Sequence, residues 1–380
     1  MKYRILGKTN RKVSILGMGA MRLPTSDGNR MGTGVREDEA VSIIQRAIDG
    51  GVNYIDTAYV YHGGRSEVVV GRALREGYRG KAQVATKSPV ARIKAAEDFD
   101  RILHEQLARL GTDHIDFYLF HGIGRAQWRK VLELGLLEKA EAARAAGKIG
   151  HVGFSFHDEF SAFQEIVEGY AGWEFCQIQY NYMDTQFQAG TRGLALAARK
   201  GIPVIVMEPV RGGRLAAPPA EVAAVLGAHA SGRTPVEWAL HWVWNRPEVK
   251  LALSGMSTRE QVDQNLAAVE RAEVGTLGLS EDEVLQKAVE LFRKRAPIPC
   301  TDCGYCVPCS QGVNIPRNFS LFNDSVTYTS GSNARFAYFH FVREEARASR
   351  CNACGECEPK CPQKIPIVSF LDRIEATFGG

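Results

Sequence analysis

Stretches that favour β-strands alternate eight times with stretches of helical period between residues 13 and 275 of this chain. Eight strands alternating with helices in this length predict a (β/α)8 TIM barrel rather than an open doubly wound sheet. A Rossmann sheet would carry G-x-G-x-x-G after its first strand, and Gly17-Met18-Gly19 does not continue in that way. The segment 3–16 predicts a hairpin that closes the floor of the barrel. Strands are expected over 13–19, 53–58, 82–87, 115–121, 151–156, 175–180, 202–209 and 249–256, with helices including 37–51, 95–112 and 258–272.

Four ionisable side chains stand at or just after the expected strand ends, where the catalytic groups of TIM barrels lie. Asp56 follows the second strand, Tyr61 stands in the next loop, Lys87 ends the third strand and His121 ends the fourth. Tyrosine is a poor acid at neutral pH unless a cation lies beside it, and Lys87 is a suitable cation. We expect Asp56 to keep Lys87 charged, Tyr61 to give a proton to a carbonyl oxygen, and His121 to orient that oxygen or relay a proton. Three further histidines near this rim are expected to serve the substrate loop or packing: His62, His151 and His157.

The region after residue 299 holds eight of the nine cysteines, in two closely spaced runs. The second run has the spacing C-x2-C-x2-C-x3-C-P of a ferredoxin-type cluster, whose fourth cysteine commonly binds a second cluster. The first run repeats this pattern with its fourth cysteine one residue early. Structural zinc usually joins two separated C-x2-C pairs, and disulfides need an oxidising compartment, so both alternatives fit less well. The cysteines predict two [4Fe–4S] clusters held by Cys300, Cys303, Cys306, Cys309, Cys351, Cys354, Cys357 and Cys361.

Length and composition narrow the class of protein further. The chain has 380 residues, enough for one large and one small domain, and 45% of them are apolar. Its net charge of +4 is too small to predict a nucleic-acid partner, and no apolar run is long enough to predict a membrane span. The polar N-terminus lacks the apolar core of a signal peptide, so a cytoplasmic location is expected. We predict a barrel over 1–278, a helical connector over 279–297 and a mainly α-helical, ferredoxin-type 4Fe–4S domain over 298–380.

The sequence resembles the aldo-keto reductases. Their Asp–Tyr–Lys–His tetrad matches Asp56, Tyr61, Lys87 and His121 in order and strand position. The strings IDTAYVY, ATKS and DFYLFHG carry the tetrad, and GKIGHVGFS and QIQYN match the region of strands five and six. The resemblance extends to the branch of the family that has a C-terminal 4Fe–4S ferredoxin-like extension. It implies NAD(P)H-dependent reduction of a small carbonyl compound, such as an aldehyde, ketone or keto-sugar, to an alcohol.

The resemblance also implies a nicotinamide dinucleotide, NAD(H) or NADP(H), extended over the barrel mouth. Three departures from the family pattern bear on it. Phe156 replaces an asparagine that many relatives have, and Met207 replaces a stacking tyrosine. Gly255 and Gln261 stand where NADP-selective members have basic residues, which leaves Arg259 as the only obvious substitute and favours NADH or dual use. The residues that the resemblance places around the nucleotide are Gly19, Ala20, Met21, Asp56, Ser155, Gln177, Met207, Pro209, Val210, Gly212, Gly213, Gly255, Ser257, Thr258, Gln261 and Asn265.

The role of the clusters is open at the level of sequence. Nicotinamide transfers two electrons as hydride and a cluster transfers one, and no flavin motif is visible to convert between them. Structural, regulatory and electron-transfer roles, the last with a redox partner protein, are all compatible with the cysteine runs. A different class of function is an iron–sulfur electron-transfer protein that uses the barrel as a nucleotide-binding or docking module. The intact tetrad argues against that class, because a docking module needs neither Tyr61 nor Lys87.

Overall fold

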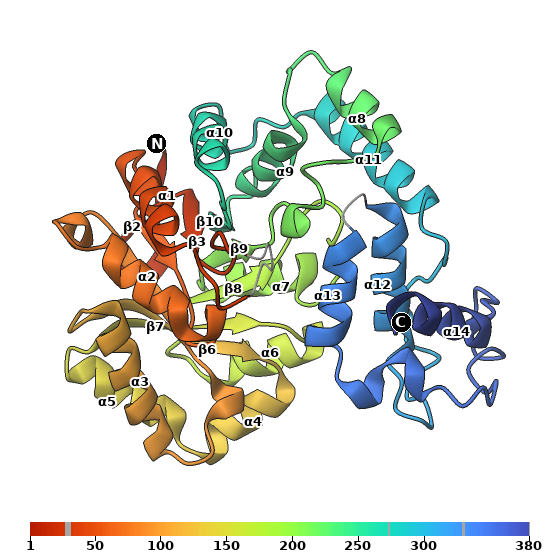
Figure 1. The fold of residues 1–380 in the computed structure, drawn as a ribbon, viewed down its shortest axis with the longest axis horizontal. Coiled ribbons are helices and arrows are strands. Elements are labelled where there is room, and N and C mark those ends of the chain that lie inside the picture. The colour runs from red at the N-terminus through yellow and green to blue at the C-terminus, as the bar shows by residue number, and fades with distance from the viewer. Residues whose placement is uncertain (27–31, 273, 329–330, 380) are drawn as a thin grey trace. The chain divides into compact units, whose positions relative to one another are not determined.

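The protein divides into two compact units that are described separately below. A computed structural model describes residues 1–26, 32–272, 274–328 and 331–379 (Figure 1). The first unit comprises Met1–Val210 and Val236–Gly278, and the second comprises Arg211–Pro235 and Leu279–Gly380. The second unit therefore includes a segment that interrupts the first along the chain.

Eight parallel strands form a closed barrel in the first unit, in the order β10-β3-β4-β5-β6-β7-β8-β9. All eight expected strands are present, so the predicted TIM barrel is confirmed. The strands alternate with helices, and every neighbouring pair is parallel, as right-handed βα crossovers require. The barrel strands are β3 (Leu16–Gly19), β4 (Tyr54–Asp56), β5 (Gln83–Ser88), β6 (Ile115–Ile123), β7 (Ile149–Phe156), β8 (Phe175–Gln179), β9 (Val204–Met207) and β10 (Val249–Ser254).

The N-terminal hairpin closes one end of the barrel. Strands β1 (Tyr3–Ile5) and β2 (Lys12–Ser14) pair antiparallel, so the expected strand over 13–19 is divided between this hairpin and β3. Leu6 and Val13 are fully buried and belong to the same apolar cluster as barrel-interior side chains such as Phe117. The hairpin thus supplies part of the barrel core at the end opposite the carboxyl ends of the strands.

The helices of the first unit cover the outside of the strands (Figure 1). In α1, the buried side chains of Ala40, Ile44 and Ala47 recur at helical spacing, which gives the helix one apolar face for the barrel. The tryptophans of α9 are buried. The helices are α1 (Glu37–Asp49), α2 (Arg65–Ala73), α3 (Glu97–Leu110), α4 (Arg125–Glu133), α5 (Leu136–Ala145), α6 (Phe160–Gly169), α7 (Gly190–Arg199), α9 (Pro235–Trp244) and α10 (Arg259–Glu270).

The second unit is helical, and its core is a separate apolar cluster. Phe319, Phe322 and Ile374 are among the buried side chains of this core, and most of the cysteines of both runs pack against it. Its helices are α8 (Ala220–Gly227), α11 (Leu279–Lys294), α12 (Ile315–Thr327), α13 (Gly331–Phe341) and α14 (Ile367–Phe378).

Short 3-10 helices connect several of these elements. They are η1 (Gly7–Thr9), η2 (Tyr61–Gly64), η3 (Tyr78–Gly80), η4 (Val90–Arg92), η5 (Arg211–Gly213), η6 (Glu344–Ala346) and η7 (Ala348–Arg350). Among the described residues, no helix has both the length and the apolar character needed to cross a membrane.

Candidate active site and metal centre

Three of the four expected catalytic side chains come from the carboxyl ends of neighbouring barrel strands. Asp56 ends β4, Lys87 is the penultimate residue of β5, and His121 lies near the end of β6. Because β4 pairs with β5 and β5 with β6, these residues share one rim of the barrel. Tyr61 begins η2, directly after the loop that leaves β4. The arrangement brings the four groups together from different parts of the sequence.

Lys87 is the centre of this group. Its side chain is fully buried, and its ammonium donates hydrogen bonds to the carboxylate of Asp56 and to the backbone oxygen of Thr57 at 2.8 Å. The same ammonium lies 3.4 Å from the hydroxyl of Tyr61. Burial opposes the charge on Lys87, but attraction to Asp56 and Tyr61 outweighs burial and raises the pKa of Lys87. The lysine is therefore a fixed, buried cation beside the tyrosine.

The electrostatics assign different protonation states to Tyr61 and His121. Burial raises the pKa of Tyr61, although Lys87 lowers it, so the effect expected of the lysine is present but smaller than that of burial. Burial and the charge of Lys87 hold the pKa of His121 well below its usual range. The two rings meet edge to face with centroids 5.6 Å apart. At neutral pH Tyr61 is a protonated donor and His121 is an uncharged imidazole.

A buried amide beside Asp56 has one polar atom without a hydrogen bond of normal geometry. Gln177, on β8, donates from Nε2 to the second carboxylate oxygen of Asp56 at 2.7 Å. Its Oε1 is buried and meets no hydrogen-bond donor at normal geometry among the described residues, although the buried Tyr54 side chain also interacts with this amide. Ser155, near the end of β7, accepts a hydrogen bond from the backbone N–H of Gly122 at 2.7 Å. Such an amide acceptor at this rim suits the NH₂ group of a nicotinamide carboxamide, so these residues fit that cofactor.

The other expected nucleotide contacts lie at strand ends, in the loops that follow them, in η5 and in α10. Ala20 is fixed to the tetrad by a 2.7 Å hydrogen bond from its N–H to the backbone oxygen of Asp56. Met207 packs against the barrel-interior cluster. Thr258 caps α10 by accepting from the N–H of Gln261, and Asn265 donates to Ser254 at 3.0 Å. The first unit holds Gly19, Ala20, Met21, Met207, Pro209, Val210, Gly255, Ser257, Thr258, Gln261 and Asn265, whereas Gly212 and Gly213 lie in η5 of the second unit.

Arg22 is a residue of this rim that the sequence analysis missed. Its guanidinium forms an ion pair with Glu208 at 3.2 Å, and its positive charge lowers the pKa of Tyr61. A Cβ placed on Gly255 would meet the Arg22 side chain at 3.4 Å. Arg22 therefore lies beside the position at which NADP-selective relatives have a basic residue. Its position directly after the Gly19–Met21 stretch was the available signal.

His62, next to Tyr61, holds two backbone segments rather than facing solvent. It is fully buried, its Nδ1 lies 2.7 Å from the backbone oxygen of Gly32, and its Nε2 accepts from the N–H of Leu23 at 3.3 Å. A backbone N–H can only donate, so Nε2 carries no proton and the ring is neutral. Burial lowers the pKa of His62 below its usual value. The packing role expected for this histidine agrees with these contacts.

The His62 contacts predict a pH dependence of stability. The pKa of His62 is lowered in the folded protein, so its contribution is complete above the unfolded value, about 6.5, and is lost as pH falls below that value. The midpoint of urea unfolding should therefore fall more between pH 7.5 and 5.5 in wild type than in His62→Asn. Asparagine suits the left-handed φ of 51° at this position and does not titrate. Equal shifts in the two proteins would contradict this prediction.

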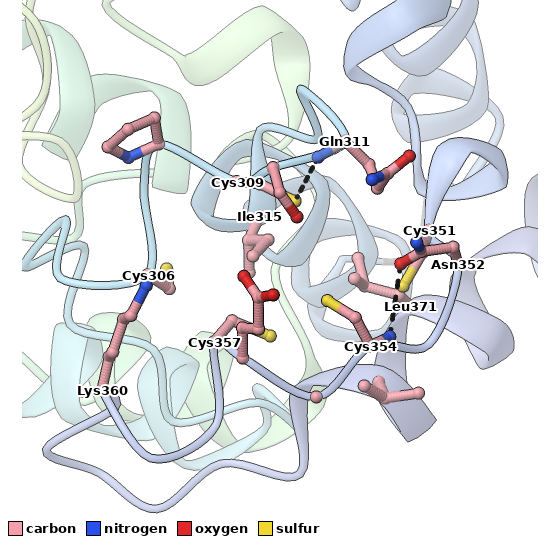
Figure 2. A pocket seen from close by; sticks show the side chains of 15 residues that line it. Cys306, Cys309, Gln311, Ile315, Cys351, Asn352, Cys354, Cys357, Lys360 and Leu371 are labelled. Carbon is pink, nitrogen blue, oxygen red and sulfur yellow. Dashed lines mark hydrogen bonds between the residues drawn. The ribbon is translucent and has the colours of Figure 1, made fainter.

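The eight cysteines of the second unit line two cavities, in sets that mix the two runs. Three thiols of the second run stand around the first cavity with two from the first run, and Figure 2 shows Cys306, Cys309, Cys351, Cys354 and Cys357 around it. The second cavity is lined by Cys300, Cys303 and Cys306 with Cys361. Cys306 thus lines both cavities. This exchange of the last cysteine is the arrangement of two-cluster ferredoxins.

The surroundings of the thiols suit a cationic cluster. Burial and the neighbouring sulfurs raise the pKa of Cys306 to about 11, and burial also raises the pKa values of Cys300 and Cys357. The thiols are therefore hard to ionise by themselves, and positive charge among them, such as iron ions supply, would stabilise the thiolates. Backbone N–H groups point to the sulfurs of Cys309 and Cys351 at 3.4 Å. Within the described part of the chain, no three His, Cys, Asp or Glu side chains converge on one point as ligands of a single ion would.

Comparison with known proteins agrees with both units. The model of the aldo/keto reductase family matches residues 15–275, and that of the 4Fe-4S dicluster domain matches residues 299–365. The chain therefore belongs to the aldo/keto reductase family of oxidoreductases, and it carries a C-terminal 4Fe–4S domain. The resemblance inferred from the tetrad and from the cysteine runs is confirmed.

Three of the proteins that are similar to this chain match it over most of their own lengths. L-galactose dehydrogenase of Arabidopsis thaliana is 26% identical over 302 residues, which are 74% of this chain and 92% of the relative. An aldo-keto reductase from Bacillus halodurans, in its holo form, has a TM-score of 0.63 at 26% identity and covers 76% of this chain and 96% of its own. An aldo/keto reductase from Klebsiella pneumoniae in complex with NADP and acetate has a TM-score of 0.59 at 25% identity, covering 76% and 95%.

Proposed function

We propose that this protein uses NADH or NADPH to reduce the carbonyl group of an aldehyde, ketone or keto-sugar to an alcohol. The observation that carries the proposal is the contact of the buried Lys87 ammonium with the Tyr61 hydroxyl on one side and the Asp56 carboxylate on the other. A buried cation beside a protonated phenol is what proton donation to a developing alkoxide requires.

Each member of the tetrad has one task in this proposal. A nicotinamide bound at the barrel mouth would supply the hydride. Tyr61 gives its proton to the carbonyl oxygen, and Lys87 stabilises the phenolate that this leaves. Asp56 keeps Lys87 charged in its buried position and orients Gln177. Neutral His121 donates a hydrogen bond that orients the carbonyl oxygen.

We assign one [4Fe–4S] cluster to each cysteine-lined cavity. In the first cavity the cluster is held by Cys309, Cys351, Cys354 and Cys357, and in the second by Cys300, Cys303, Cys306 and Cys361. The clusters have a structural or regulatory role, because ligation by both runs ties together a small unit whose own apolar core is limited.

The proposed reaction is tested with protein purified without oxygen. Oxidation of NADH and of NADPH is followed with a panel of aldehydes, ketones and keto-sugars. Turnover of at least one carbonyl class is expected. A protein that binds neither nucleotide would overturn the proposal, and one that binds nucleotide without reducing any carbonyl would favour the electron-transfer alternative.

Nucleotide preference is a separate prediction. Gly255 and Gln261 offer no charge to a 2′-phosphate, so NADH should bind wild type at least as well as NADPH, although the relative from Klebsiella holds NADP. The double variant Gly255→Lys, Gln261→Arg should shift the preference toward NADPH by roughly 1.5–3 kcal/mol, the usual contribution of a hydrogen bond to a charged group. Gly255 has a φ that other residues tolerate, so the backbone permits the change. Strong NADPH selectivity in wild type would contradict this expectation, and Arg22→Ala and Arg259→Ala would then test which of these arginines is the clamp.

A second candidate function is electron exchange with a partner protein. Cys303 and Cys354 are exposed, so a cluster in either cavity would approach the surface of the second unit. In this alternative the clusters are reduced and oxidised during turnover. A carbonyl-reduction rate that follows the redox state of the clusters would support it, and an independent rate would exclude it.

A further inference from the structure

The segment that leaves β9 is part of the cysteine-rich unit. Met207 ends β9, and from Arg211 onward the chain belongs to the second unit until Pro235. Arg211, Gly212 and Gly213 have φ angles of 49°, 64° and 87°. Such a backbone is costly for the arginine and persists only where surrounding contacts hold it. Gly212 and Gly213 are also residues that the family resemblance places along the nucleotide pyrophosphate.

The carboxylate of Asp324 pairs with two arginines of this segment. Asp324, in the last turns of α12, accepts from Arg211 at 3.2 Å with one oxygen and from Arg214 at 2.7 Å with the other. All three side chains are nearly buried, with exposed fractions of 13%, 12% and 7% for Arg211, Arg214 and Asp324. Arg211 also donates to the hydroxyl of Tyr328, and both guanidinium groups lie over the Tyr328 ring at 5.0 and 6.0 Å from its centroid.

The burial of these charges makes the arrangement cooperative. Removing one partner of a buried ion pair leaves an uncompensated charge, which is far more costly than losing an exposed pair. Here one carboxylate pairs with two guanidinium groups, so displacement of Asp324 would weaken the support of both arginines together. The conformation of the segment after β9 therefore depends on the position of α12.

Helix α12 is in turn positioned by the cysteine runs. Its first turn begins shortly after Cys309, and Ile315 lines the first cavity while Pro316 and Phe319 line the second. About 14 Å of rigid helix separate Ile315 from Asp324 at 1.5 Å per residue. A shift at the cluster end of this helix is thus transmitted to its carboxyl end.

The same helix is bonded to the chain that leads into the second cysteine run. Asn318 is fully buried, donates to the backbone oxygen of Ala346 at 2.9 Å and accepts from the N–H of Ala348 at 3.0 Å. Ala348 begins η7, which ends directly before Cys351. Both cysteine runs therefore help to position α12: the first run through the first turn of the helix, and the second run through the hydrogen bonds of Asn318.

We propose that Asp324 is a positioning residue for nucleotide binding, and that assembly of the clusters sets nucleotide affinity through α12. The inference rests on the proposed function, because it takes the segment after β9 as part of the nucleotide site. Cluster loss removes the support of the first turn of α12, loosens the Asp324 pairs and lets the left-handed segment sample other conformations. Apparent affinity then falls in proportion to the population that is still competent to bind.

The test is a cycle of four proteins: wild type and Asp324→Asn, each with full iron and after iron removal by anaerobic chelation. The dissociation constant of NADH or NADPH, whichever wild type binds more tightly, is measured by titrating nucleotide fluorescence. With full iron, Asp324→Asn should weaken binding about tenfold, as a drop of the competent population to about one tenth would. Iron removal should weaken wild type by a similar factor and have little further effect on Asp324→Asn. In steady-state kinetics, Asp324→Asn should raise KM for the nucleotide more than it lowers kcat.

Controls separate positioning from general damage. Asp372→Asn, an exposed carboxylate on α14, should retain wild-type iron content and nucleotide affinity. Tyr328→Phe removes the hydroxyl partner of Arg211 but keeps the ring, so it should weaken binding in the same direction by a smaller factor if Asp324→Asn folds poorly.

Three outcomes would overturn the inference or its basis, and they are distinguishable. If Asp324→Asn and Tyr328→Phe both bind nucleotide with wild-type affinity at full iron content, Asp324 does not position the nucleotide site. An equal loss of affinity on iron removal in wild type and in Asp324→Asn overturns the route through α12. A wild type that binds neither nucleotide instead removes the proposed function on which the inference rests.

Discussion

Replacing Tyr61 with phenylalanine is expected to lower carbonyl turnover by about 10²–10⁴-fold, the usual contribution of a general acid. The phenol is the only tetrad group that combines a proton at neutral pH with contact to the buried Lys87 ammonium. The ring stays in place in the variant, so its edge-to-face contact with His121 and the binding of nucleotide should persist. The measurement compares kcat and the nucleotide dissociation constant of the two proteins.

Tyr59→Phe is a matched control in the same loop. Its hydroxyl donates to Glu105 at 2.6 Å and lies outside the tetrad, so turnover should stay near the wild-type rate. Wild-type turnover in Tyr61→Phe would show that another group donates the proton, and the mechanism proposed above would be wrong.

Replacing Cys354 with serine is expected to reduce the iron content of anaerobically prepared protein from about eight atoms per chain to about four. Cys354 lines only the first cavity, so the cluster in the second cavity keeps its four thiols. The unfolding midpoint of the second unit should fall as well, because ligation contributes to its folding free energy. Iron and sulfide assays together with the visible absorption spectrum measure the change.

Cys176→Ala is the control for loss of a thiol, because Cys176 is buried in β8 and lies far along the chain from both runs. Its iron content should equal that of wild type. Wild type with about four irons would mean that the irregular first run assembles no cluster of its own. Stoichiometric zinc without iron, after strictly anaerobic preparation, would contradict the assignment of iron–sulfur clusters.

Much of the fold followed from patterns that are local in the sequence. Each barrel strand has a short apolar run bounded by turn residues, and the rule that catalysis lies at carboxyl strand ends selected Asp56, Lys87 and His121 from many ionisable residues. The structure brings these residues together with Tyr61. The divided first strand was not predicted, because apolar character continues through 13–19 while the pairing partner changes at Ile15.

Contacts between distant residues were the part that local patterns could not supply. The bond from Gln177 to Asp56 joins residues that are 121 positions apart, and neither residue type predicts the other. The pairing of Arg211 with Asp324 is of the same kind, as is the association of 211–235 with residues after 278. Domain boundaries predicted as consecutive residue ranges cannot represent a segment such as 211–235, which interrupts one unit along the chain and packs in the other. Arg22 was missed because a lone arginine in a loop has no pattern of its own.

The mixed cysteine sets around the two cavities also constrain the order in which the protein can be built. The barrel strands precede Cys300 on the chain, so the first unit can begin to fold during synthesis, as N-terminal domains generally do. The cavity lined by Cys300, Cys303 and Cys306 is completed only by Cys361, and that of the second run needs Cys309. The first cavity therefore has all its thiols only once Cys357 has been synthesised, and the second only once Cys361 has, so the thiols of the first run must stay reduced and unligated until the end of the second run emerges. Iron delivery to this protein is then a late, single event in its biogenesis rather than two successive ones.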